Sequence, residues 1–131
     1  MKKTTLLHAE LSRMIARLGH GDTLVIADAG LPVPEGTPCI DLAVTRGVPS
    51  FPQVLAAVLS EMQVERIIVA RELRARSPGM HEHIAAAFPG VTAEEISHAE
   101  LKALTRQARA VVRTGEFTPY ANVVLVAGVV F

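Results

Sequence analysis

The sequence predicts an α/β fold, a layered single domain with a mostly parallel central sheet flanked by helices. Segments with helical apolar spacing alternate along the chain with short runs of β-branched and aliphatic residues. These strand-like runs are apolar throughout, which is typical of strands covered by helices on both faces. The 131 residues contain no repeat, low-complexity tract or linker, so we assign residues 1–131 to one domain.

The elements of the first half follow from apolar spacing, caps and breakers. Leu11, Ile15 and Leu18 recur at helical spacing, and Gly19 ends that pattern. Ser50 precedes the next amphipathic stretch as a helix cap. In chain order we expect a helix over 11–18, strands over 23–27 and 39–44, a helix over 51–62 and a strand over 64–70.

The second half repeats the alternation. Pro78 suits the first turn of a helix, and Ser97 with Glu100 forms a capping-box pattern that opens another. We expect helices over 78–88 and 98–108, a weaker strand over 91–96, and strands over 110–114 and 122–130. Because the last strand nearly reaches Phe131, we expect the apolar chain end to pair in the sheet or to pack against a second subunit.

Composition argues against several classes of partner. Thirteen Lys and Arg residues balance thirteen Asp and Glu residues, so neither nucleic acid nor an anionic membrane is an expected partner. No segment reaches the roughly 18 apolar residues of a membrane span, and we expect no signal peptide. The single cysteine, Cys39, excludes an internal disulfide, and we place it in the core of a cytoplasmic protein. The aliphatic excess favours a homo-oligomer.

Candidate site residues follow from the rule that ligands of open α/β sheets bind beyond the carboxyl ends of strands. Asp28 follows the strand over 23–27, and as a carboxylate it can accept sugar hydroxyls or orient an imidazole. It could equally be a turn residue that satisfies loop N–H groups. His20 lies on the turn before the same strand, and we expect it to sit beside Asp28. An imidazole can give and take a proton near neutrality. The alternative, which the local sequence favours, is a surface histidine in a helix-ending turn.

Further candidates follow two later strands. Tyr120 and Asn122 offer an apolar face, a hydroxyl and an amide, which suit a polyol ligand, but they could also form a simple turn. His98 starts a helix, where an exposed first-turn histidine is the alternative. The five histidines and one cysteine show no zinc-ligand spacing, so we assign no metal. Gly19 and Gly21 precede a strand rather than follow one and no phosphate-binding loop occurs, and we expect no cofactor.

Read together, these segments resemble one known family. The pattern Gly19-His20-Gly21-Asp22, Asp28-Ala29-Gly30-Leu31-Pro32, Thr45-Arg46-Gly47-Val48-Pro49-Ser50-Phe51, Gly115-Glu116, Pro119-Tyr120-Ala121-Asn122 and Ala127-Gly128-Val129 is similar to the D-ribose pyranase family. Fucose mutarotases share the Gly-His-Gly-Asp turn and the Asp that follows it. The stretch 71–95 departs most from the pattern and carries none of the matched site residues.

The resemblance implies a ribose pyranase-like fold and an isomerase of ribose catabolism. Its reaction would interconvert β-D-ribopyranose and β-D-ribofuranose, feeding D-ribose to its kinase without a cofactor. His20 matches the catalytic acid, and the substrate-binding positions match Asp28, His98, Tyr120, Ala121 and Asn122. The family also implies a ring-shaped homo-oligomer, usually a decamer, with sites at subunit boundaries. A mutarotase for fucose or another monosaccharide, a non-catalytic sugar-binding accessory of a transporter and a purely structural oligomer remain the alternatives.

Overall fold

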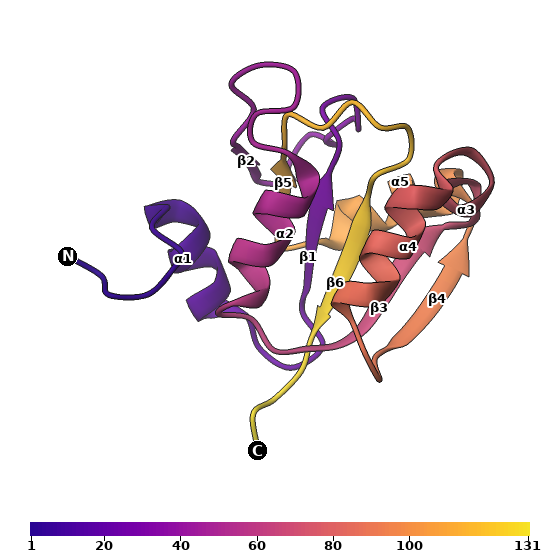
Figure 1. Ribbon diagram of the computed structural model, residues 1–131. Coiled ribbons are helices and arrows are strands. Elements are labelled where there is room, and N and C mark those ends of the chain that lie inside the picture. Colours follow the sequence, from indigo (N-terminus) through magenta and orange to yellow (C-terminus); the bar gives the residue numbers. More distant parts are fainter.

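The computed structural model describes residues 1–131 and contains one six-stranded sheet between two layers of helices (Figure 1). The elements in chain order are α1 (Ala9–Arg17), β1 (Thr23–Ala27), β2 (Cys39–Asp41), α2 (Phe51–Leu59), β3 (Val64–Ala70), α3 (Arg71–Arg76), α4 (Pro78–Ala87), β4 (Thr92–Ile96), α5 (His98–Leu104), a 3-10 turn η1 (Thr105–Gln107), β5 (Ala110–Arg113) and β6 (Val123–Ala127).

The sheet has the strand order β2-β5-β1-β6-β3-β4. Five strands run in one direction, and β6, in the middle of the sheet, runs antiparallel to both of its neighbours. The predicted α/β fold with a mostly parallel sheet is therefore confirmed, with the last strand as the exception. This reversal places the start of β6 at the edge where the other five strands end. We call that edge the carboxyl edge and the opposite one the amino edge.

Two hydrophobic clusters hold the layers together. The larger cluster joins α1, α2, α3 and α4 to one sheet face, with Phe51, Leu73 and Leu125 fully buried in it. The smaller cluster packs α5 on the other face, around Leu101. Burial of apolar side chains at about 25 cal/mol per Å² is the main favourable contribution to this arrangement. None of the helices is both long and apolar enough to span a membrane.

Some sequence expectations differ from the structure. β6 ends at Ala127, so Val130 and Phe131 do not pair in the sheet and are exposed. Cys39 is also exposed rather than part of the core, because β2 is a short edge strand. The helix α3 was not predicted at all. It has no side-chain cap, so its six residues carry no start signal in the sequence.

Candidate functional site at the carboxyl edge

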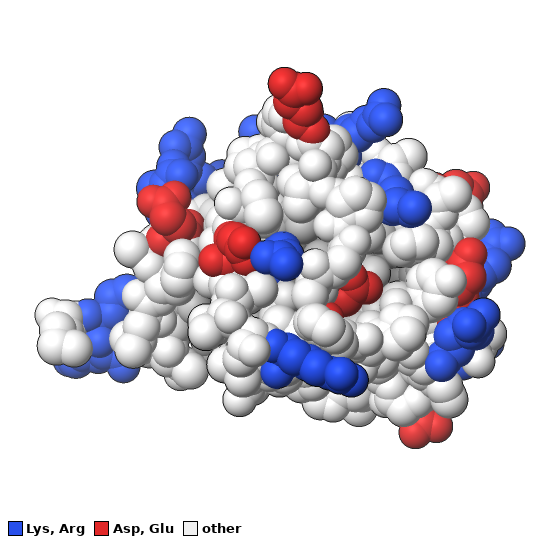
Figure 2. Space-filling view, turned by 90° about the horizontal axis from the view of Figure 1, so that it is seen from above, with Lys and Arg blue, Asp and Glu red and all other residues white.

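The carboxyl edge brings together segments that are far apart in the sequence. Ala27 of β1 lies opposite Arg113 of β5, and Ala70 of β3 lies opposite Ile96 of β4. The loop over 114–122 reaches the same edge because β6 begins there. In Figure 1 this edge and its loops lie at the top. Seen from above, positive and negative side chains are interspersed over this face without an extended patch of one sign (Figure 2).

Asp28 and Asn122 form a reciprocal pair at this edge. The Asp28 N–H donates to Asn122 Oδ1, and Asn122 Nδ2 donates to Asp28 Oδ2, both over 2.9 Å. Asn122 is fully buried, so its amide is held in one orientation. Asp28 Oδ1 also accepts from the Gly30 N–H over 2.9 Å. Asp28 therefore has the turn role that the sequence suggested, and its carboxylate is held in place at the pocket wall.

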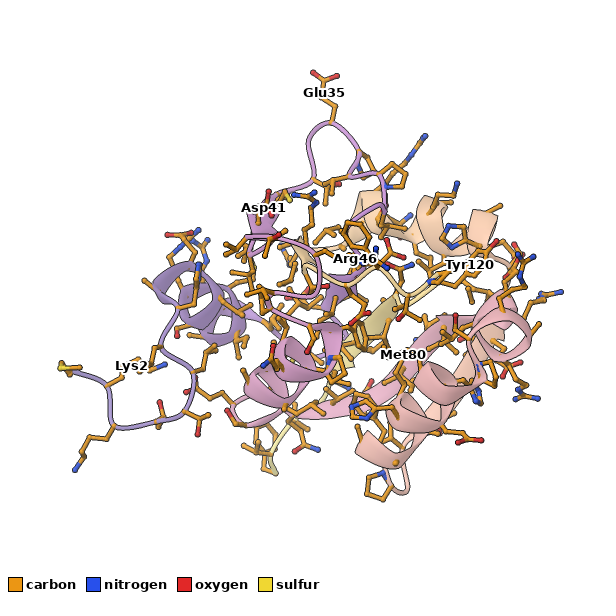
Figure 3. All side chains as sticks on the ribbon, turned by 45° about the horizontal axis from the view of Figure 1, so that its top comes forward. Lys2, Glu35, Asp41, Arg46, Met80 and Tyr120 are labelled. Carbon is orange, nitrogen blue, oxygen red and sulfur yellow. The ribbon has the colours of Figure 1, made fainter.

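His98 packs against Tyr120 beside that pair. The two rings meet edge to face, with centroids 5.0 Å apart and planes at 85°. Tyr120 adopts a left-handed backbone conformation with φ 63°, and the Asn122 N–H donates to its carbonyl over 2.7 Å. Figure 3 shows Tyr120 among the side chains over this edge. The arrangement supplies an aromatic wall next to the Asp28–Asn122 pair.

Burial sets the charge of His98. Removal from water lowers the pKa of the His98 imidazole, and the Lys102 charge lowers it further. The negative charges of Asp28 and Glu72 act in the opposite direction without reversing the shift. Its Nδ1 is buried and has no hydrogen-bond partner. His98 is thus a neutral imidazole at pH 7, and it is half-buried rather than an exposed first-turn residue.

A pocket of about 340 Å³ opens next to these groups. Arg113 is held at its wall, donating from Nε to the Ala29 carbonyl over 3.0 Å and pairing through Nη1 with Asp41. The lining residues are Asp28, Ala29, Gly30, Arg113, Glu116, Phe117, Thr118 and Pro119. A volume of this size suits a small polar molecule.

Glu116 anchors the loop that forms one side of the pocket. Its carboxylate accepts from the Phe51 N–H over 3.0 Å and from both the N–H and the hydroxyl of Thr118. Burial alone would raise the pKa of the Glu116 carboxyl, but these hydrogen bonds outweigh it and lower that pKa. Glu116 therefore stays ionised and ties the pocket loop to the start of α2.

Gly115 lets this loop approach its neighbour. A Cβ at position 115 would lie 2.5 Å from the Thr45 carbonyl oxygen and 2.6 Å from that of Val48. Both contacts are with backbone, which cannot move aside easily. We expect Gly115→Ala to lower the free energy of unfolding by about 3 kcal/mol, measured by urea denaturation at a fixed protein concentration. Gly79→Ala is the matched control, because it lies in α4 with open space around it and gains helix propensity. Equal stability of the two variants would contradict this reading.

His20 lies at the amino edge, on the opposite side of the sheet from this pocket. The turn that carries it precedes β1, whereas Asp28 follows β1. The five residues of β1 at about 3.3 Å each separate the two by about 16 Å. The expectation that His20 sits beside Asp28 is therefore wrong within one copy of the chain. The structure brings together Asp28, His98, Tyr120, Ala121 and Asn122, and it leaves His20 apart.

Comparison with known proteins decides the family. Residues 1–130 match the RbsD / FucU transport protein family. The chain belongs to this family. A D-ribose pyranase from Paracidovorax citrulli is 63% identical over 131 residues, which is the whole of both chains. The structure of Bacillus subtilis RbsD complexed with D-ribose matches with a TM-score of 0.97 and 47% identity over all of both chains. The fucose mutarotase from Streptococcus pneumoniae in complex with L-fucose shares the fold, with a TM-score of 0.80 at 23% identity over all of both chains.

This RbsD / FucU chain has further residues at the candidate site that sequence patterns did not single out. Arg113 ends a strand, where its side chain gave no signal distinct from a surface arginine. Glu72 accepts the His98 N–H through Oε2 over 3.0 Å and so fixes the start of α5. It lies in α3, within the stretch that carried no motif. Among the described residues, no group of three or more His, Cys, Asp or Glu side chains could hold a metal ion.

Proposed function

We propose that this chain is a D-ribose pyranase, an isomerase that interconverts β-D-ribopyranose and β-D-ribofuranose. The observation that carries the proposal is its full-length similarity to proteins of that name, at up to 63% identity among those compared. The backbone match to Bacillus subtilis RbsD, solved with D-ribose, supports a sugar site in the same fold. The likeness to fucose mutarotase at 23% identity bears on the fold alone.

The reaction needs only proton transfers. Ring opening breaks the bond between the anomeric carbon and the ring oxygen, which takes up a proton, while the anomeric hydroxyl loses one and becomes the aldehyde. Closure reverses these transfers with a different hydroxyl as nucleophile. The chain must therefore offer an acid, a base and groups that hold the hydroxyls. General acid and base catalysis contributes about 10²–10⁴-fold to such a reaction.

The carboxyl edge supplies a base and the hydroxyl-binding groups. We assign Asp28 to accept hydrogen bonds from sugar hydroxyls, since its carboxylate is held at the pocket wall by Asn122. We assign Tyr120, beside this pair, to orient the sugar, and the buried Ala121 and Asn122 to hold Asp28 and Tyr120 in place. His98, neutral at pH 7, is the candidate acceptor for the proton of the anomeric hydroxyl.

The acid, His20, then has to come from a second copy of the chain. It lies at the amino edge, so one copy alone has no acid at its pocket. Exposed apolar side chains occur at both edges. Val44, Val48 and Phe117 lie on loops of the carboxyl edge, and Val130 and Phe131 lie beyond the amino edge. A head-to-tail contact would cover both sets and carry His20 to the neighbouring pocket.

Head-to-tail contacts close into rings when the rotation between copies permits it. We therefore propose that the chain assembles into a ring-shaped homo-oligomer. The proposed size is a decamer made of such rings. The proposed location is the cytoplasm, which agrees with the single exposed thiol of Cys39. A mass from light scattering tests the decamer, and fractionation of cells that express the chain tests the location.

Exchange NMR on D-ribose tests the function directly. We expect saturation of the β-pyranose anomeric signal to transfer to the β-furanose signal much faster with the protein than without it. No acceleration with ribose, together with acceleration of L-fucose anomer exchange, would instead identify a fucose mutarotase. Calorimetric ribose binding without faster exchange would identify a non-catalytic accessory of a transporter. A chain that bound no sugar would be a structural oligomer.

The pH dependence tests the role of His98. Because the burial-lowered pKa lies below 6.5, His98 is neutral near pH 7 and gains a proton as the pH falls. We expect kcat/KM to fall tenfold per pH unit once the pH drops below the His98 pKa. His98→Gln should lose this acid limb along with most of the activity. His83→Gln, an exposed change on α4, should keep both. A wild-type kcat/KM that showed no fall at any pH below 6.5 would argue against His98 as the base.

A further inference from the structure

The strand β3 contains one extra residue at the amino edge. Val64 lies opposite Ala127 of β6, but Arg66 lies opposite Val126, so Glu65 has no partner across the pair. This is a β-bulge. It breaks the alternation of the strand, because Glu65 and Arg66 are both exposed. Bulges turn a side chain away from its regular direction, and they are frequent next to active sites.

The bulge directs Glu65 at His20. Glu65 Oε2 lies 2.8 Å from His20 Nε2. The side chains keep 42% and 62% of their surface exposed, so the pair is accessible to a second copy of the chain. A carboxylate only accepts hydrogen bonds, so Nε2 carries the hydrogen in this contact. The remaining ring nitrogen, Nδ1, is then the atom that gives or takes a proton.

The turn around His20 is fastened on both sides. The Gly19 N–H donates to Asp22 Oδ2 over 2.8 Å, and the Gly21 N–H donates to the Ala127 carbonyl over 2.9 Å. The Gly19 N–H lowers the pKa of the Asp22 carboxyl, and its ion pair with Arg109 lowers it further. Asp22 therefore stays ionised and holds the turn.

The bulge is fastened to the same end of β6. The Gly128 N–H donates to the Gln63 carbonyl over 3.0 Å. A Cβ at position 128 would lie 3.0 Å from Glu65 Cβ and 3.3 Å from its backbone nitrogen. Glycine at this position leaves room for the bulge, so the turn and the bulge are set relative to each other through one strand end.

We propose that Glu65 is a positioning residue for His20. It accepts the Nε2–H, holds the neutral imidazole in the tautomer with Nδ1 unprotonated, and fixes the ring so that Nδ1 faces outward. This inference rests on the proposed function, in which His20 is the acid. Protonated His20 gives its Nδ1 proton to the ring oxygen as the bond to the anomeric carbon breaks. The imidazole that remains keeps its Nε2–H on Glu65, and the anomeric hydroxyl proton goes to the base in the pocket.

The test compares Glu65→Gln and Glu65→Ala with wild type in the ribose exchange assay. We expect kcat to fall about tenfold with KM unchanged, well below the loss of about 10²–10⁴-fold that removal of a proton-transfer group produces. Long-range ¹H–¹⁵N spectra of the His20 ring should show the Nε2–H tautomer in wild type and a mixture of both tautomers in the variants. Glu94→Gln is the matched control, because it removes an exposed carboxylate from the Arg66 ion pair on the adjacent strand.

The outcomes separate the two proposals. If wild type accelerates exchange and both Glu65 variants keep the wild-type kcat and ¹⁵N spectrum, Glu65 does not position His20. A change in KM with an unchanged kcat would also overturn this role, since a positioning residue acts on the proton-transfer step. If wild type itself gives no acceleration, the proposed function fails, and the tautomer spectra still report whether Glu65 holds the ring.

Discussion

His20→Ala is expected to lower the pyranose–furanose exchange rate constant by about 10²–10⁴-fold, the usual contribution of an acid or base. The fold should be unaffected, because the side chain is largely exposed and its one hydrogen bond is to Glu65, which is itself exposed. Ribose should still bind, since Asp28, Asn122 and Tyr120 lie at the other edge. Exchange NMR measures the rate, and calorimetry measures ribose binding. A His20→Ala protein with the wild-type rate would remove His20 from the mechanism.

The same variant tests whether the site is shared between copies. His20→Ala lacks the acid, and Asp28→Asn lacks a group of the pocket, so each alone should be nearly inactive. In rings assembled from equal amounts of both, about a quarter of the head-to-tail contacts join an intact amino edge to an intact carboxyl edge. We expect about that fraction of wild-type activity after co-expression. The control is a mixture of the two variants that were assembled separately and do not exchange subunits. No recovery in mixed rings would place both residues in one copy.

The regular elements were predictable because local signals and tertiary packing agree in them. The strands β1 and β3 have their predicted bounds, since each is a continuous apolar run between breakers. The helices α2 and α5 start where expected, and both capping boxes form: Ser50 with Gln53 and Ser97 with Glu100. The carboxyl-edge rule likewise placed Asp28, His98 and the loop that ends at Asn122 at one edge, because strand direction determines where loops meet.

What escaped prediction depends on pairing between distant segments. Nothing local distinguishes an antiparallel β6 from a parallel one, yet its direction delivers Asn122 to Asp28. The partnership of Glu65 with His20 depends on a bulge, which exists only in the register of β3 against β6. The position of His20, by contrast, follows from β1 alone. The turn that carries His20 precedes β1, and Asp28 follows β1. The strand therefore holds the two residues at opposite edges of the sheet, although they are only eight positions apart in the sequence.

The second large effect is expected for Asn122→Asp. The substitution keeps the oxygen that accepts the Asp28 N–H but replaces the amide that donates to Asp28 Oδ2 over 2.9 Å. Two carboxylates at that separation in a fully buried position cannot both be ionised, so one of them holds a proton and its pKa rises. We expect the exchange rate constant at neutral pH to fall about 10²-fold, because displacement of Asp28 misplaces the sugar.

The stability of Asn122→Asp should depend on pH in a direction that identifies the cause. A carboxyl whose pKa is raised in the folded state stabilises the fold below its unfolded pKa of about 3.9, and this contribution is lost as the pH rises through the folded pKa. The variant should therefore be closest to wild type in acid and lose about 1–3 kcal/mol relative to it by neutral pH. Urea denaturation across that range measures the difference, and Gln107→Glu, the same amide-to-acid change on an exposed side chain, should show none. A deficit that did not grow with pH would mean that the buried amide acts through shape rather than through its hydrogen bond to Asp28.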